Sequence, residues 1–173
     1  MKRLLFSTLV VMALGSGVAW ACRCSLAGVT NPELVREAFD NAAFVAEVEI
    51  VSSDVVTETR RVSGERLKEL DGKEHAQSEL YPLQVYVAQL KLLKLWKGAS
   101  TVKSLESGYL GNTCGNIRFH AGDKLLLYAN ETDQADRVST WHCMRTRPLA
   151  EAKEDLEILS TETASTFTAT EPD

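Results

Sequence analysis

The sequence lacks the short motifs that mark most hydrolases and nucleotide-binding proteins. It has no Gly-x-Ser-x-Gly nucleophile elbow, no phosphate-binding glycine loop and no HExxH pair of histidines. Its three histidines, His75, His120 and His142, are widely spaced along the chain. Because no catalytic set of residues is recognisable, we expect that the protein is not an enzyme and has no cofactor of its own.

The sequence also lacks an excess of positive charge and, after its first residues, any long apolar run. The formal net charge is −5 at pH 7, which argues against nucleic acid as a partner. No segment after residue 21 approaches the ~20 apolar residues that a transmembrane helix needs. We therefore expect no stable transmembrane anchor.

Residues 1–21 have the pattern of a signal peptide. Lys2 and Arg3 precede an apolar run from Leu4 to Leu14, and the small residues Ala19 and Ala21 occupy positions −3 and −1 of a cleavage site. The run is shorter than a membrane span. This pattern predicts an exported protein that is secreted to the extracellular space or kept in a periplasm.

A lipoprotein signal, in which Cys22 would be acylated, is the competing interpretation of the same residues. That signal prefers Leu at −3 and a small residue at −2, whereas this chain has Ala19 and Trp20 there. The sequence therefore favours ordinary cleavage, which leaves Cys22 as the first residue of the mature protein.

Cysteine is scarce, and all four cysteines follow the predicted cleavage site: Cys22, Cys24, Cys114 and Cys143. An even number of cysteines in an exported chain predicts two disulfides. A bond between Cys22 and Cys24 would close a strained ring, so we expect both to pair with Cys114 and Cys143. His142 beside Cys143 suggests a metal site with the cysteines, but export favours disulfides.

Residues 22–159 are expected to form one domain, followed by a Thr- and Ser-rich disordered tail at 160–173. The periodicity predicts a helix at Pro32–Asn41, strands at Phe44–Val51, Leu83–Trp96, Val102–Ser107, Lys124–Ala129 and Val138–Cys143, a long hairpin excursion at 52–80, a turn at Ala121–Asp123, and a second helix from Thr146 to Leu159. The predicted fold is mainly β with flanking helices, as a five-stranded antiparallel barrel of the OB type.

The segment Leu83–Trp96 allows two interpretations. Lys91, Lys94 and Lys97 interleave with leucines, which is typical of an amphipathic helix at a membrane surface. The β-branched start at Val85–Val87 and the stop at Gly98 favour a strand instead. The apolar face changes sides at Leu92–Leu93, which predicts a β-bulge in a long bent strand.

The predicted mature N-terminus has a particular chemistry. The α-amino nitrogen and the carbonyl oxygen of Cys22 can chelate one metal ion in a five-membered ring, and the amine has an ordinary pKa of ~7.7–8.0. A catalytic zinc keeps one coordination position open for water. An N-terminus fixed by disulfides at Cys22 and Cys24 could displace that water and block an enzyme. The simpler interpretation is that the disulfides only stabilise the fold.

Several motifs resemble the netrin-like domain of the tissue inhibitors of metalloproteinases. They are Cys22-x-Cys24 after the cleavage site, Glu37-Ala38-Phe39-x-Asn41-Ala42-x-Phe44-Val45, Cys114-Gly115, Gly122 before Leu125-Leu126-Leu127-Tyr128-Ala129, and Cys143. The resemblance covers residues 22–159. The chain lacks the second, cysteine-rich domain and the third disulfide of the animal proteins, so it is more similar to single-domain, inhibitor-like proteins of bacteria.

The resemblance implies a fold, a disulfide pairing and a site. It implies an OB-type barrel and disulfides Cys22–Cys114 and Cys24–Cys143. It also implies that Cys22, Arg23, Cys24 and Ser25 head a ridge that enters a protease cleft, with Cys22 bound to the zinc of the target. Arg23 stands where the family usually has Thr or Ser. A buried guanidinium needs a carboxylate partner, so Arg23 would suit a target with an acidic pocket.

Two functional hypotheses follow from the sequence. The first is an exported inhibitor of a zinc metalloprotease that acts through Cys22. The second is a non-inhibitory, netrin-like binding or scaffold module of the cell envelope or extracellular space, whose barrel and 52–80 excursion bind a partner. The sequence carries no signal for an oligomeric state.

Overall fold

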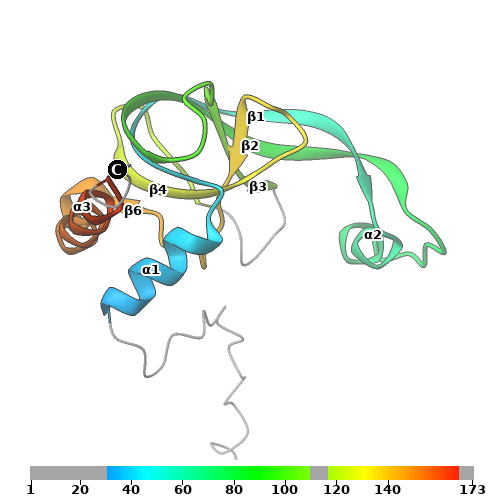
Figure 1. The fold of residues 1–173 in the computed structure, drawn as a ribbon. Coiled ribbons are helices and arrows are strands. Elements are labelled where there is room, and N and C mark those ends of the chain that lie inside the picture. The colour runs from blue at the N-terminus through cyan, green and yellow to red at the C-terminus, as the bar shows by residue number, and fades with distance from the viewer. Residues whose placement is uncertain (1–30, 110–116, 168–173) are drawn as a thin grey trace, which may run out of the picture.

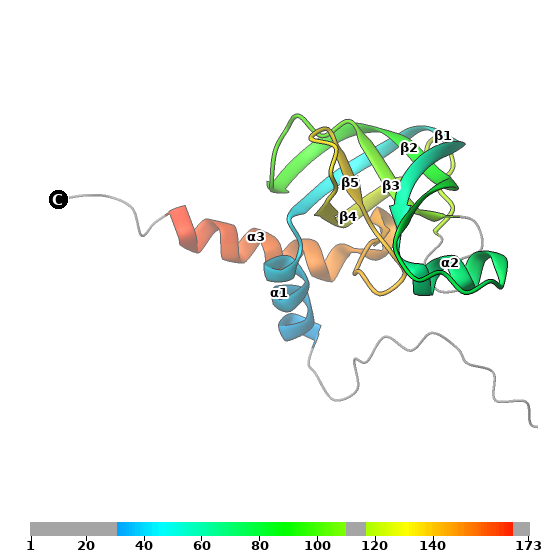
Figure 2. The same cartoon turned by 90° about the vertical axis from the view of Figure 1, so that its right-hand side faces the viewer.

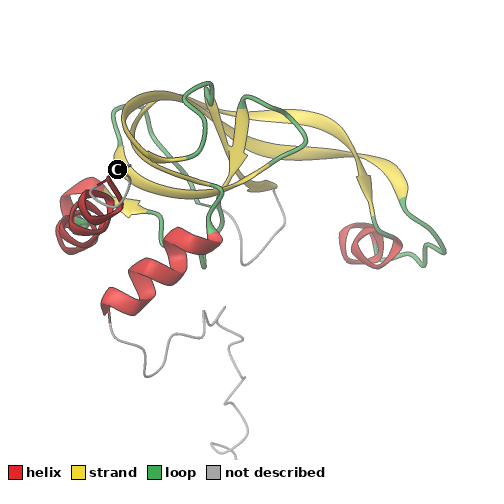
Figure 3. Ribbon diagram, viewed as in Figure 1, coloured by secondary structure: helices red, strands yellow, loops and turns green. Residues whose placement is uncertain are grey.

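A computed structural model describes residues 31–109 and 117–167 of the chain (Figure 1). The elements, in order, are α1 (Asn31–Asn41), β1 (Phe44–Val62), α2 (Gly64–Asp71), β2 (Glu79–Lys97), β3 (Ser104–Tyr109), β4 (Lys124–Glu131), β5 (Arg137–Ser139), β6 (Arg147–Pro148), a 3-10 turn (Leu149–Glu151) and α3 (Lys153–Phe167). Figure 3 shows that strands dominate and helices lie at the periphery. The mainly β class with flanking helices is confirmed.

Five strands form a closed ring of pairings. The order is β1-β2-β3-β5-β4, and β4 also pairs with β1 and so closes the ring, while β6 adds to β4. Every pairing is antiparallel except that of β3 with β5, which is parallel. The prediction of an all-antiparallel order is wrong at this place. After β3 the chain first forms β4. It then returns as β5, which lies between β3 and β4 in the ring and runs in the same direction as β3.

A cluster of buried apolar side chains fills the ring. All five ring strands contribute to it, together with one residue that follows the 110–116 segment: Phe44, Ala46, Val48, Ile50, Ala88, Leu105, Phe119, Leu125, Leu127, Ala129 and Val138. The alternation that predicted the first strand is therefore confirmed, because Phe44, Ala46, Val48 and Ile50 all point inward. Burial of this area is the main stabilising contribution to the ring.

The two longest strands, β1 and β2, run for 19 residues each. Glu47 pairs with Lys94 and Val48 pairs with Leu92, which leaves Leu93 without a partner in β1. The predicted bulge at Leu92–Leu93 is confirmed, and the amphipathic-helix interpretation of this segment is wrong. The extra residue lets the strand bend while its apolar side chains stay on the inner face.

Helices α1 and α3 cover one outer side of the ring near β1 and β4 (Figures 1 and 2). A second apolar cluster lies there, formed by Val35, Ala42, Val45, Leu126, Tyr128, Ala152 and Leu159. The helix predicted at Pro32–Asn41 is confirmed as α1, and its inner side carries Val35, Ala38 and Phe39. This helix layer positions the candidate site described below.

The β1–β2 hairpin continues beyond the ring as an arm, defined here as residues 52–84 (Figure 1). Pairing extends as far as Val62 with Glu79, so the predicted hairpin excursion is confirmed. Its tip carries α2, which the periodicity did not predict. Ser63 caps the helix by accepting a hydrogen bond from the Arg66 N–H at 3.3 Å, and Gly72 ends it with a φ of 75°.

The arm has its own small apolar cluster on one face. Leu67 of α2 is fully buried there against Val62, Leu83, Val85 and Val87. The helix lies close to the loop that follows it, because a Cβ on Gly64 would lie 2.3 Å from the carbonyl oxygen of His75. The opposite face of the arm has no such cover, since Val55 is 47% exposed and Leu80 is 65% exposed.

The segment after β5 differs from the prediction. The predicted strand Val138–Cys143 ends at Ser139, so the three residues before Cys143 leave the sheet. Side-chain hydrogen bonds replace the ladder there. The Thr146 Oγ1 accepts from the Tyr128 N–H at 3.0 Å, and the Thr140 Oγ1 donates to the Tyr128 carbonyl at 2.9 Å. These bonds hold the loop against β4 without a continuous strand.

The last helix also begins and ends later than predicted. Arg147–Pro148 pairs with β4 as a short strand, and α3 begins only at Lys153. It continues to Phe167, so residues 160–167 of the predicted disordered tail are helical. Once Leu156 and Leu159 dock on the ring, each further residue adds a helical hydrogen bond at little cost. None of the helices in the described part of the chain has the length and apolarity to cross a membrane.

Candidate functional site

Most of the predicted inhibitory and disulfide residues lie outside the described residues. These are Cys22, Arg23, Cys24, Ser25 and Cys114. The remaining one, Cys143, is half-buried in the loop that joins β5 to β6, and it is disulfide-bonded to a partner outside the described residues. The pairing with Cys24 that the resemblance implies therefore stays a prediction.

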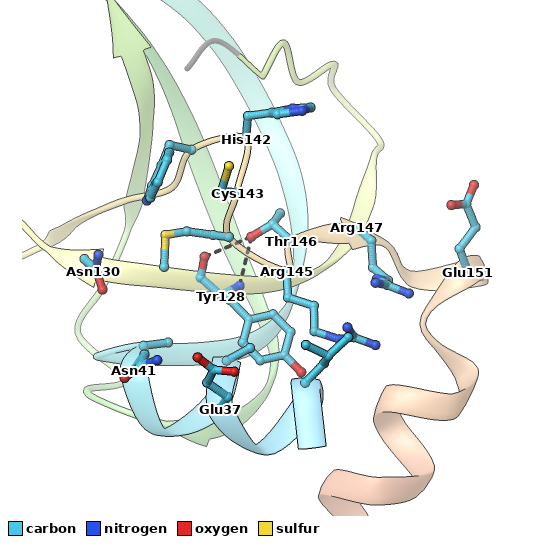
Figure 4. Close-up of a pocket in the computed structure, with 15 residues that line it drawn as sticks. Glu37, Asn41, Tyr128, Asn130, His142, Cys143, Arg145, Thr146, Arg147 and Glu151 are labelled. Atoms are coloured by element: carbon cyan, nitrogen blue, oxygen red, sulfur yellow. Dashed lines mark hydrogen bonds between the residues drawn. The ribbon is translucent and has the colours of Figure 1, made fainter. Parts of the chain in front are cut away.

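Cys143 borders a hollow between α1, β4 and the loop 140–147 (Figure 4). The hollow has a volume of about 670 Å³. Its lining residues are Leu34, Glu37, Ala38, Asn41, Ala42, Tyr128, Asn130, Trp141, His142, Cys143, Met144, Arg145, Thr146, Arg147 and Glu151. They come from segments that are about a hundred residues apart in the sequence.

A buried ion pair holds the lower wall of the hollow in place. The Arg145 Nε donates to Asp155 Oδ2 at 2.6 Å, and the Arg145 Nη2 donates to Asp155 Oδ1 at 2.9 Å. Only 9% of the Arg145 side chain and 1% of the Asp155 side chain are exposed. The same Nη2 also donates to the side-chain oxygen of Asn31. This bond ties the beginning of α1 to a residue two positions after Cys143.

Tyr128 lies beside this ion pair under the hollow. Its side chain is fully buried. Burial raises the pKa of the Tyr128 hydroxyl, and the negative charge of Asp155 raises the pKa further. The phenol therefore stays neutral at any physiological pH. The Tyr128 backbone also anchors Thr140 and Thr146, as described above. This residue therefore connects the ring to the loop of Cys143, and Figure 4 shows its bonds with Thr146.

The rim of the hollow carries polar side chains that have no partner among residues 31–109 and 117–167. The side chains of Glu37, Asn41, Asn130 and His142 make no hydrogen bond or ion pair with other residues in the described part of the chain. Trp141 is 49% exposed on the same rim. In Figure 4, Asn41 and Asn130 lie at one end of the hollow, and Arg147 and Glu151 lie at the other end.

A second cluster of charges joins the arm to the ring. Arg60 of β1 donates to Glu106 of β3 through Nη1 at 2.7 Å and Nη2 at 2.6 Å. Glu58 accepts from Arg60 Nε at 3.0 Å and from Arg137 Nη1 at 2.6 Å. Burial alone would raise the pKa of Glu58, but the hydrogen bonds from Arg137 and Arg60 outweigh it and lower the pKa. Because the two arginines and the two glutamates neutralise one another, we interpret this cluster as a stabilising contact and not as a ligand-binding site.

The structure brings together residues that sequence reasoning did not join into one site. Glu37 and Asn41 entered the sequence argument only as parts of a motif, and Trp141 did not enter it. His142 was considered for a metal site with cysteine, but the described residues contain no group of three or more His, Cys, Asp or Glu able to hold a metal ion. One signal was available, because Glu37 and Asn41 are four residues apart and share a helix face.

Comparison with known proteins adds no assignment to this geometry. No protein-family model and no curated protein matches the chain. The functional argument therefore depends on the residues themselves.

Proposed function

We propose that the protein is an exported inhibitor of a zinc metalloprotease, built on an OB-type barrel with a mature N-terminus at Cys22. The amine and carbonyl of Cys22 would occupy the open position of the target's zinc. Arg23, Cys24 and Ser25 would continue along the cleft of the target. The protein itself would need no metal, because the zinc belongs to the protease.

The strand connectivity supports the OB-type part of this proposal. The ring order β1-β2-β3-β5-β4, closed by β4 on β1, is the order expected for a small five-stranded Greek-key barrel. The parallel β3–β5 pairing is typical of this architecture, although the sequence argument expected antiparallel pairings throughout. In this interpretation α1 precedes the barrel and places the N-terminal segment at one end of it.

The observation that carries the proposal is the disulfide at Cys143, close to the beginning of α1. Arg145 binds Asn31, so the chain enters α1 beside the loop of Cys143. Cys24 lies seven residues before Asn31, and an extended chain of that length reaches at most ~24 Å. A Cys24–Cys143 bond is therefore within reach and would fix the N-terminus to the ring. A chelating amine requires such a fixed position, because a mobile N-terminus pays an ordering cost on binding.

Arg23 restricts the class of target. Its guanidinium would enter the pocket that recognises substrate side chains. Transfer of that charge from water is costly unless a carboxylate pairs with it. We therefore expect a zinc protease whose specificity pocket contains Asp or Glu.

The experiment is a single-residue extension of the mature N-terminus. Addition of Ala before Cys22 removes the chelating geometry, because the free amine then belongs to the added residue. We expect loss of inhibition of a zinc protease that prefers basic side chains, with unchanged circular dichroism and unchanged thermal unfolding. Arg23→Thr serves as the matched variant, because it keeps the amine and changes only the choice of target. Equal inhibition by the extended protein would refute zinc chelation by Cys22.

The arm favours a second candidate function, a non-inhibitory binding or scaffold module. Its uncovered face exposes Val55 and Leu80 at two separate places along the hairpin, where a partner could cover them. Replacement of the arm (residues 52–84) by a short turn separates the two functions. Loss of binding to an envelope or secreted partner, with the N-terminal segment intact, would favour the module. Retained inhibition by the armless protein would favour the inhibitor.

A further inference from the structure

We propose that the hollow beside Cys143 is a binding site for a neutral saccharide. Its volume of about 670 Å³ falls within the ~300–1,000 Å³ that is usual for small-molecule sites. The proposal concerns residues of α1, β4 and the loop 140–147. It does not depend on zinc chelation by Cys22, so the two proposals can fail separately.

The aromatic side of the hollow is formed by Trp141. Its indole is 49% exposed, although a large aromatic side chain in a folded protein is usually well covered. An indole offers an apolar face together with an N–H donor. A pyranose has the complementary surface, because its C–H groups form an apolar face and its hydroxyls lie around the edge. Met144, half-buried in the same wall, extends the apolar surface.

The polar side of the hollow matches hydroxyl groups better than any other ligand chemistry. Glu37 and Asn41 are one helical turn apart on α1 and so lie on the same side of that helix. Asn130 approaches from β4 (Figure 4). Each amide supplies two donor hydrogens and one acceptor oxygen, and the carboxylate supplies acceptors only. Neighbouring hydroxyls of a sugar both donate and accept, so they can satisfy all three side chains.

The charges of the hollow exclude an anion as the main ligand. The Arg145 guanidinium is already bound to Asp155 and Asn31, which leaves it unavailable for a phosphate or a carboxylate. Glu37 and Glu151 would repel an anion from either end. Arg147 offsets only one of these two carboxylates, so the hollow has no positive surface. A mixed rim of this kind suits a ligand without net charge.

An apolar ligand fits less well than a saccharide for a different reason. It would cover the amides of Asn41 and Asn130 and the carboxylate of Glu37 without replacing their hydrogen bonds to water. Each polar group left unsatisfied in this way weakens binding. A saccharide covers Trp141 and also replaces those bonds.

The test is a titration of the oxidised, full mature chain with cellotriose and with chitotriose. Both are neutral and β-linked, so their rings present flat C–H faces to an indole. We expect saturable binding of at least one of them with a Kd of about 1 mM or tighter, measured by tryptophan fluorescence and by NMR shifts of α1 and of residues 140–147. Trp141→Ala and Asn130→Ala should each weaken binding about tenfold or more.

One control variant and a third site variant keep the proposal falsifiable. Leu80→Ser changes an exposed apolar residue on the arm and should leave binding unchanged. Asn41→Ala changes a single exposed helical position and provides a folded variant if Trp141→Ala unfolds. The assignment is overturned if neither trisaccharide binds, or if binding occurs and all three site variants retain the affinity of the unmodified protein.

Discussion

The ring and the arm are built from the same two strands, yet they are stabilised differently. Inside the ring, β1 and β2 bury their inner face in an apolar cluster to which all five ring strands contribute. In the arm, the same strands are covered on one face only, by α2 and its small cluster, while Val55 and Leu80 face water on the other. Each of these strands therefore lines the core in one half and forms a projecting hairpin in the other. The difference between the two halves lies in the elements that pack against them.

The two regions also differ in how they hold their charges. The Arg145–Asp155 pair, next to the ring, is almost fully buried, with side chains 9% and 1% exposed. In the cluster that holds the arm, Arg60 is 26% exposed and Glu58 is 21% exposed. Their partners Arg137 and Glu106 are 12% and 11% exposed, so solvent screens only Arg60 and Glu58 more strongly than it screens Arg145 and Asp155. We therefore expect removal of the Glu58 charge to cost less stability than removal of the Asp155 charge.

The largest effect is expected from Asp155→Leu. This substitution leaves the buried Arg145 guanidinium without its carboxylate, a change that typically costs about 3–5 kcal/mol of unfolding free energy. Urea unfolding followed by circular dichroism measures the loss.

The double variant Arg145→Met with Asp155→Leu is the matched control. It removes both charges and should recover a large part of the lost stability, because neither charge is then left unpaired. If the double variant is as unstable as the sum of the two single changes, the pair is not coupled and the contrast with the arm loses its electrostatic basis.

The next effect compares two fully buried leucines, Leu127 of the ring and Leu67 of α2. Leu127→Ala should cost about 2–5 kcal/mol, since it removes buried methyl groups and leaves a cavity in the main core. Leu67→Ala should cost the whole protein less, because the arm can open locally without unfolding the ring. Denaturant unfolding gives the global loss, and hydrogen exchange of arm amides gives the local one. Equal global losses would mean that the ring and arm unfold as one unit.

The sequence predicted the ring better than the arm, for a physical reason. Alternation of apolar side chains is strong where a strand lines the core, as in Phe44 to Ile50, and the reversal at Leu92–Leu93 located the bulge. In the arm, both faces carry polar residues, so the period of the strands is hidden. The sequence does contain a signal for the short helix α2, which the prediction missed. Ser63 and Gly72 are typical helix caps, and Leu67 and Leu70 are three residues apart.

The candidate site was predictable only in part. Cys143 was identified as a site residue because its chemistry is visible in a linear sequence. The hollow was not, because it depends on α1 and the loop 140–147, which meet only after the ring has closed. The late start of α3 was missed for a similar reason. Thr146 and Arg147 look like a helix start, but their bonds to Tyr128 and Asp155 are tertiary contacts.

The smallest effect is expected at the tip of the arm, where His75 joins the end of α2 to the beginning of β2. The His75 Nδ1 lies 3.1 Å from Glu79 Oε1, and the Nε2 lies 3.0 Å from Asp71 Oδ2. Hydrogen bonds to Glu79 and then to Asp71 raise the pKa of His75 above its usual value of 6.5. Both nitrogens can donate only in the imidazolium, so the neutral ring loses one of the two bonds.

Because the folded pKa lies above the unfolded one, this contribution is complete below about pH 6.5 and is lost as the pH rises through the folded pKa. The other charged groups near His75 are Lys73 and the Lys68–Glu74 pair. NMR titration of the His75 ring should give a midpoint above 6.5, and exchange of the arm-tip amides should accelerate over the same interval while β4 amides show no matching step. A His75→Phe variant should lack the step. A midpoint at or below 6.5, or an equal step in β4, would show that the tip is not an independent, pH-sensitive part of the arm.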